Sequence, residues 1–218
     1  MKAVRKAVRK DWYIIIIIAA GLVLGLLLYA RLPSQIVTHW NVEGMPDGYS
    51  SRLSGVLSIP LMNIALYILF TFLPHIDPKK SNYGKFAGSY QILKLLIASF
   101  MSVIQAAIMA FAVGLKFSMA ALTCICVSLV FIIIGNMMGR FRFNYFVGIK
   151  TPWTLASEEV WRKTHRMAAP LWTAGGILIF ILAFFPPKFT VAGIISIAIL
   201  ISAVPVVYSY AAYRKLGN

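Results

Sequence analysis

The sequence predicts an all-α membrane protein, a bundle of six transmembrane helices with a short interfacial helix on the cytoplasmic side. Of its 218 residues 60% are hydrophobic, against roughly 45–50% in soluble domains. The apolar residues also fall in uncharged runs near the ~20 residues that a helix needs to cross the hydrocarbon of a bilayer. The six runs are 12–30, 53–74, 95–115, 117–139, 167–187 and 189–213.

The basic residues predict that both chain termini are cytoplasmic. With this assignment of the loops, 17 of the 21 Lys and Arg residues lie on one side and only Arg31, Arg52, Lys116 and Lys188 on the other. Such an asymmetry marks the cytoplasmic side of a membrane protein. The net charge of +15 is therefore explained by topology, so we expect a multi-pass protein of the cell membrane that contacts the lipid bilayer and no nucleic acid directly.

The order of helices and loops predicts two domains. Residues 1–90 form a helical hairpin with an extracellular loop at 31–53, and residues 91–218 form a four-helix membrane domain with a cytoplasmic loop at 140–166. The first run, 12–30, ends without a small-residue cleavage site, so it is interpreted as an uncleaved helix rather than a signal peptide. Because connections in compact bundles are usually short, function is expected in the two long loops.

Polar residues within the runs are few. Asn63, Gln105 and Asn136 are expected to face the bundle interior, where side-chain amides bond across helices. Lys94 is expected to extend its amine to the cytoplasmic interface. No Asp, Glu or Arg is expected deep in the membrane, so a transporter driven by protons or ions is disfavoured.

The outer loop contains a turn-forming stretch, NVEGMPDGYS, which begins at Asn41. Gly44, Pro46, Asp47 and Gly48 favour a tight turn, in which Gly48 is expected to take the positive φ. His39, Glu43 and Asp47 are weak candidates for a metal site or acid–base chemistry, because their spacing matches no metal motif. The favoured interpretation is a folded cap with Trp40 at the lipid interface, and no cofactor is expected.

The inner loop carries more specific signals. Gly148 permits a close backbone approach, and Pro152 forces Thr151 out of the helical region, which is expected to present Trp153 in an extended segment. Ser157 is a helix N-cap ahead of Glu158, so a short helix is expected to start there.

On that short helix Glu158, Trp161 and His165 share one face, and Glu158/Arg162 and Glu159/Lys163 are favourable i,i+4 pairs. One interpretation is an interfacial anchor with Trp153 and Trp161 in the aromatic belt. The other is an output element that binds a partner. Its candidate residues are Asn136, Asn144, Gly148, Thr151, Pro152, Trp153, Thr154, Glu158, Trp161 and His165.

These motifs resemble the SdpI-type bacterial membrane proteins, a family named for an immunity protein against a secreted peptide toxin. The resemblance rests on Gly135-Asn136, Asn144, GIKTPWTL at 148–155, SEEVW at 157–161 and KTHR at 163–166, and the outer loop is similar to a domain of unknown function commonly found ahead of them. It implies resistance to a secreted peptide toxin and sequestration of a cytoplasmic winged-helix autorepressor at the membrane.

Two other functions remain open. A membrane-embedded hydrolase acting on peptides would use His39, Glu43 and Asp47 or Glu158 and His165, but HExxH, GxSxG and paired intramembrane aspartates are absent from the sequence. A transporter or lipid-binding scaffold is the third function. An enzyme is therefore disfavoured without being excluded.

Overall fold

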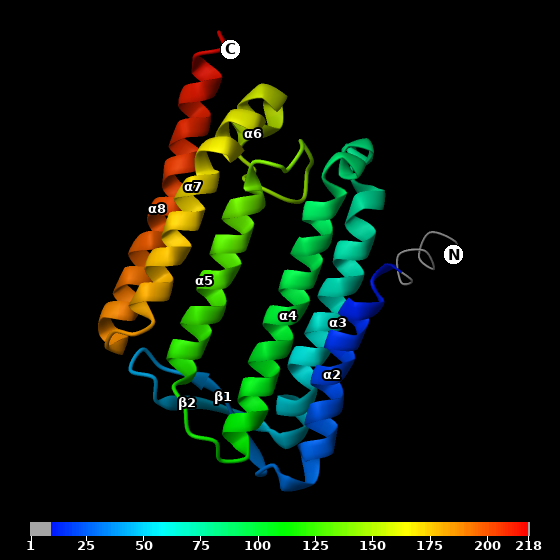
Figure 1. The fold of residues 1–218 in the computed structure, drawn as a ribbon, viewed down its shortest axis with the longest axis vertical. Helices are drawn as coiled ribbons and strands as arrows, with labels where there is room; N and C mark the ends of the chain where they lie inside the picture. Colours follow the sequence, from blue (N-terminus) through cyan, green and yellow to red (C-terminus); the bar gives the residue numbers. More distant parts are fainter. Residues whose placement is uncertain (1–9, 218) are drawn as a thin grey trace. The chain divides into compact units, whose positions relative to one another are not determined.

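The computed structural model describes residues 10–217, and helices dominate it (Figure 1). The long helices are α2 (Trp12–Leu28), α3 (Arg52–Ile76), α4 (Ala87–Ala112), α5 (Met119–Met138), α7 (Glu158–Leu182) and α8 (Pro187–Arg214). Shorter elements are α6 (Pro152–Ala156), the 3-10 turns η1 (Tyr29–Arg31) and η2 (Lys80–Phe86), and the strands β1 (Gln35–Trp40) and β2 (Pro46–Ser51). Among the described residues six helices are long and apolar enough to cross a membrane, so the predicted fold class is confirmed.

The chain forms two compact units, each built from separate stretches of sequence. Of the described residues, one unit contains 10–72 together with Lys94–Thr123, and the other contains Leu73–Leu93 and 124–217. Helices α3, α4 and α5 each contribute to both units. The two domains expected on either side of residue 90 stay a prediction.

In the first unit, α2, α3 and α4 pack side by side around buried amides. Asn63 donates to Ala98 O at 3.1 Å and to Ser102 Oγ at 3.2 Å, and Gln105 donates to Val56 O at 3.2 Å. Both amide side chains are almost fully buried, as the sequence predicts. These interhelical bonds replace the water that a bilayer cannot supply.

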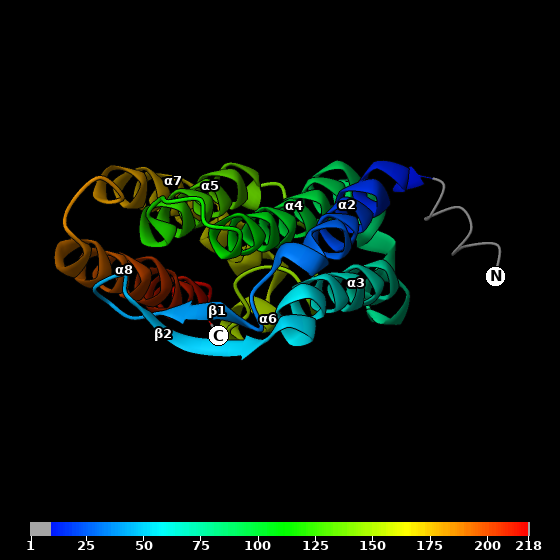
Figure 2. The ribbon, with the colours of Figure 1, turned by 90° about the horizontal axis from the view of Figure 1, so that it is seen from below.

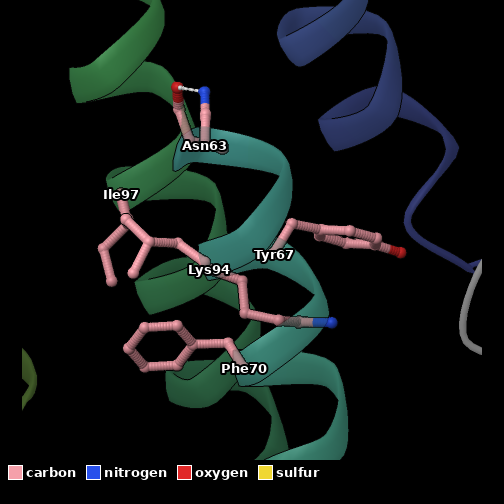
Figure 3. Close-up of a pocket in the computed structure, with 7 residues that line it drawn as sticks. Asn63, Tyr67, Phe70, Lys94 and Ile97 are labelled. Carbon is pink, nitrogen blue, oxygen red and sulfur yellow. Dashed lines mark hydrogen bonds between the residues drawn. The ribbon is translucent and has the colours of Figure 1, made fainter. Parts of the chain in front are cut away.

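An ion pair at the start of α2 was not expected. Lys94 donates to Asp11, which also accepts from Tyr67 Oη at 3.3 Å. Figure 3 shows Lys94 and Tyr67 extending to the same side, toward α2. The Lys94 and Asp11 side chains are only 7% and 1% exposed, so the prediction that Lys94 reaches out to the interface is wrong. The counter-charge is Asp11, the residue at the N-terminal boundary of α2.

The outer loop is a β-hairpin, an element that the sequence reading missed. Strands β1 and β2 pair antiparallel, with Gln35 opposite Ser51 and Val37 opposite Tyr49. Ile36 is buried and lies against Gly55 of α3. The Trp40 ring meets Phe111 of α4 edge to face, with ring centroids 5.4 Å apart. The hairpin is therefore held against its own unit by apolar contacts, which a two-stranded sheet needs for stability.

The hairpin turn corrects the expected role of Gly48. The positive φ of this loop, +79°, belongs to Gly44, and Gly48 lies within β2 opposite His39. A Cβ on Gly48 would come within 2.7 Å of the His39 Cβ. Glycine is therefore required at position 48 because the two strands approach closely there. The residue in the left-handed conformation is Gly44.

In the second unit α5, α7 and α8 pack along one another (Figures 1 and 2). A Cβ on Gly135 of α5 would come within 2.6 Å of Thr173 N of α7. A Cβ on Gly176 of α7 would come within 2.7 Å of Ile132 Cγ1 of α5. The two helices therefore approach closely at these glycines. Trp172 of α7 donates to Ile201 O of α8 at 3.1 Å.

Two predictions for this unit are wrong. The short interfacial helix is instead the first part of α7, which continues from Glu158 to Leu182 without a break. Pro170 lies inside it, and a proline is tolerated in a membrane helix when neighbouring groups satisfy the freed carbonyl. Asn136 is exposed rather than interior; it lines an open groove of about 410 Å³ beside Pro170 and Thr173.

Candidate functional site

The segment 140–166 folds around the side chain of Asn144. This side chain is fully buried. Its amide nitrogen donates to Arg142 O at 2.8 Å and Val147 O at 2.9 Å, and its oxygen accepts from Phe146 N at 2.9 Å and Val147 N at 2.7 Å. Asn144 thus satisfies the backbone of a loop that has no regular secondary structure. Leucine at this position would leave these buried backbone groups unpaired, so Asn144 stabilises the loop.

Gly148 brings the loop against α7. Its φ is +127°, and a Cβ there would overlap His165 Nε2 and come within 3.0 Å of the Trp161 ring. The next residue, Ile149, donates its N–H to His165 Nε2 at 2.9 Å. The close approach expected of Gly148 is confirmed.

His165 and Trp161 form the buried wall that receives the loop. Each side chain is 1% exposed, and their rings stack with centroids 4.1 Å apart. His165 Nδ1 donates to Trp161 O at 2.8 Å, so with Ile149 N–H on Nε2 both ring nitrogens are occupied by backbone groups. This arrangement holds a neutral imidazole and leaves no nitrogen for a metal or for proton transfer. Trp161 donates Nε1–H to Phe141 O at 3.0 Å, so it is a core residue and the prediction of a lipid-belt anchor is wrong for it.

Thr151 and Thr154 begin the short helix α6. Thr151 is extended, with φ −113° and ψ 162°, as its position before proline predicts. Thr151 Oγ1 accepts from Thr154 N at 3.1 Å, and Thr154 Oγ1 accepts from Thr151 N at 2.8 Å. Thr151 Oγ1 also lies 3.0 Å from Ser209 Oγ of α8. This reciprocal capping box makes residues 152–156 helical, so the prediction that Trp153 lies in an extended segment is wrong.

The basic loop between α3 and α4, HIDPKKSNYGK at 75–85, supports the same segment, a role that the sequence did not predict. Asp77 is 2% exposed. It accepts from Lys79 N at 2.7 Å, Tyr83 Oη at 2.9 Å and Tyr145 N at 3.0 Å. Asn82 donates to Phe143 O at 2.9 Å. The proline and glycine in HIDPKKSNYGK indicate a loop, but nothing in this stretch predicts that Asp77 bonds to Tyr145, 68 residues away.

Charged side chains border a hollow on the surface of this scaffold. The hollow measures about 210 Å³ and is lined by Phe141, Arg142, Phe143, Glu158, Glu159, Trp161 and Arg162. Glu158, Arg142 and Arg162 are exposed. Glu159 pairs with Lys163 at 2.7 Å, which confirms that predicted i,i+4 pair. The face expected to carry Glu158, Trp161 and His165 is therefore split between an exposed carboxylate and two buried rings.

The outer-loop candidates do not assemble into a metal centre. His39 Nδ1 lies 2.5 Å from Asp47 Oδ1, and Asn41 Oδ1 accepts from Glu43 N and Met45 N, each at 3.0 Å. Within residues 10–217 no three His, Cys, Asp or Glu side chains are grouped to hold a metal ion.

Comparison with known proteins bears on this segment directly. Residues 140–209 match the SdpI/YfhL protein family. The match begins at Arg140, so it contains the loop around Asn144, α6, α7 and most of α8. A second match, over residues 16–64, is to a domain of unknown function, DUF1648. It covers most of α2, the hairpin and half of α3.

The SdpI resemblance extends over nearly the whole chain. The chain is 26% identical over 210 residues to the Immunity protein SdpI of Bacillus subtilis (strain 168). The aligned region covers 96% of this chain and 99% of that relative. No solved structure matches the chain. The six apolar helices and this similarity to a membrane immunity protein indicate a multi-pass membrane protein that contacts the lipid bilayer.

Proposed function

We propose that this SdpI-type protein confers immunity to a secreted peptide toxin. The observation that carries the proposal is the near full-length similarity to an immunity protein. The match of residues 140–209 to the SdpI/YfhL protein family also supports the proposal, because these residues include the loop around Asn144 and α7. A hydrolase receives no such support, since both nitrogens of His165 are bonded to the backbone and Glu158 is exposed.

The proposed orientation places both termini and the segment 140–166 in the cytoplasm and the hairpin outside, following the charge asymmetry. Alkaline phosphatase, which is active only outside the cytoplasm, is expected to be active when fused at Asp47 and silent when fused at Asn218. A cytoplasmic reporter at the same two positions should give the opposite pattern. Activity at Asn218 in the phosphatase series would contradict this orientation.

A signalling role for the segment 140–166 is the finer part of the proposal. The buried side chains of Asn144 and His165 bond to the backbone of this segment, and the segment presents Arg142, Glu158 and Arg162 around a hollow. Such a preorganised charged surface suits a cytoplasmic protein, because little side-chain entropy is lost on binding. We propose a winged-helix autorepressor as that partner, held at the membrane when toxin is present.

Glu158→Gln tests this surface. The side chain is exposed at the first turn of α7, so removing its charge is expected to leave membrane abundance and thermal stability unchanged. Loss of a charged contact at an interface costs about 2 kcal/mol or more, at least a tenfold loss in affinity. We therefore expect Glu158→Gln to lose protection or the recruitment of a cytoplasmic protein to membranes on toxin challenge.

The control for Glu158→Gln is Lys116→Gln, which removes an exposed charge outside the segment. Both variants are compared at equal membrane abundance, by survival under challenge and by fractionation of cytoplasmic proteins. If Glu158→Gln and Lys116→Gln both behave like the parent, the hollow has no part in output.

A further inference from the structure

The tip of the β-hairpin, residues 41–49, is a second exposed surface with its own chemistry. It carries Glu43 and Asp47, two of the six carboxylates of a chain whose net charge is +15. Residues 32–51 contain no Lys or Arg. The tip is therefore acidic in an otherwise strongly basic protein.

The nearest arginine in the sequence is directed away from the tip. Arg52 donates Nε–H to Pro33 O at 3.1 Å and lies over the Tyr29 ring, 5.4 Å from its centroid. Asp47 contacts His39, as described above, and among the described residues Glu43 forms no ion pair. The carboxylates of the tip are thus not neutralised by Lys or Arg.

Large apolar side chains lie among these carboxylates. Val42, Met45 and Tyr49 are 62%, 61% and 58% exposed. An exposed apolar patch bordered by charge is typical of a protein interaction site. The combination of acidic and apolar groups is complementary to a peptide that carries basic side chains next to apolar ones.

The tip is also rigid enough to present this surface. Asn41 N donates to Met45 O at 2.9 Å, and the Asn41 side chain accepts from two backbone N–H groups within the turn. Trp40 and Ile36 hold the strands below it against α4 and α3. A partner would therefore meet a formed surface, which lowers the entropic cost of binding.

We propose that the hairpin tip binds a cationic, apolar peptide through Glu43, Asp47, Val42, Met45 and Tyr49. This assignment rests on the proposed immunity function and orientation, because the toxin would then meet the tip from outside. All five of these side chains are exposed, and Figure 2 shows β2 as the outer strand of the pair.

The test measures peptide binding to the purified full chain in a non-ionic detergent. The probes are a fluorescent peptide of alternating Lys and Leu and its counterpart with Glu in place of Lys. The cationic probe is expected to bind at least about tenfold tighter, since like charges at an interface oppose binding. The double variant Glu43→Gln/Asp47→Asn and the double variant Val42→Ser/Met45→Ser are each expected to lose about tenfold in affinity for the cationic probe.

The matched control is Glu159→Gln, which removes an exposed carboxylate outside the hairpin and is expected to bind the probe as the parent does. Helix content and melting temperature of each variant show whether it is folded. Equal binding of both probes, or equal losses in the hairpin and control variants, would overturn the assignment. Binding that disappears in nanodiscs of zwitterionic lipid would mean that lipid or a second copy of the chain covers the tip, which also overturns it.

The outcome separates this surface from the proposed function. If the parent chain protects cells while the probe ignores Glu43 and Asp47, immunity stands and the tip is not the binding surface. If the probe follows these carboxylates but no peptide challenge is survived, the surface stands and the immunity proposal fails.

Discussion

Replacing Gly148 by alanine is expected to destabilise the second unit by about 3 kcal/mol or more, because two costs add. Alanine at a φ of +127° is strained by about 1–3 kcal/mol. Its Cβ would also overlap His165 Nε2 and the Trp161 ring, so the loop must move away and the bond from Ile149 N–H is lost. The measurement is unfolding in detergent, followed by the fluorescence of the buried Trp161 and by helix content.

Two other glycines separate these costs. Gly114 has a φ of +98° and nothing within 4 Å of an added Cβ, so Gly114→Ala reports the backbone strain alone. Gly84 has free space and no positive φ, so Gly84→Ala should be close to neutral. The expected order of destabilisation is Gly148, then Gly114, then Gly84. A Gly148→Ala protein no less stable than Gly114→Ala would show that the loop does not pack on His165 as described.

Lys94→Met is expected to be the most damaging change in the first unit. The Asp11 carboxylate is 1% exposed, and methionine would remove the Lys94 ammonium that it accepts a hydrogen bond from. Breaking a buried ion pair on one side costs about 3–5 kcal/mol, because the remaining charge stays desolvated. Unfolding in mixed detergent micelles measures this loss.

The double variant Asp11→Asn/Lys94→Met provides the decisive comparison. Replacing both charges removes the desolvated carboxylate, so its stability is expected to return to within about 1–2 kcal/mol of the parent. The exposed pair Glu159 and Lys163 serves as the control, since Lys163→Met should have no measurable effect on stability. If Lys94→Met unfolds like the parent, or if the double variant is no more stable than Lys94→Met, the buried pair of Asp11 and Lys94 does not stabilise the first unit.

Local chemistry explains the parts of the site that the sequence predicted. Thr151 is extended because proline follows it, Ser157 caps α7, and Glu159 pairs with Lys163 one turn later. Each of these features depends on neighbours within four residues, so composition and spacing are sufficient to find it. Gly148 belongs with them, since a lone glycine in a polar loop signals a close approach even when its partner is unknown.

Contacts between residues far apart in the sequence account for the errors. Trp161 is of a residue type that is common at membrane interfaces, but its side chain is buried and donates its N–H to the carbonyl of Phe141. The Lys94 side chain is long enough to extend toward an interface, but it pairs with Asp11, 83 residues away in the sequence. The sequence of the outer loop predicts turns because apolar and polar residues alternate little in β1 and β2. The strands are instead stabilised by Ile36 and Trp40, which pack on helices.

The sequence by itself determined the six membrane helices and the loops that connect them. Long apolar runs have no soluble alternative, and the cost of leaving backbone groups unbonded in hydrocarbon makes those runs helical. Only the tertiary structure decided which polar side chains are buried in pairs, as Asp11 with Lys94 and Asn144 with its own loop, and which stay exposed, as Glu158 and Asn136 do. The reason is physical: a buried polar group must find a partner wherever the fold places one, and that partner is set by packing rather than by its distance along the chain.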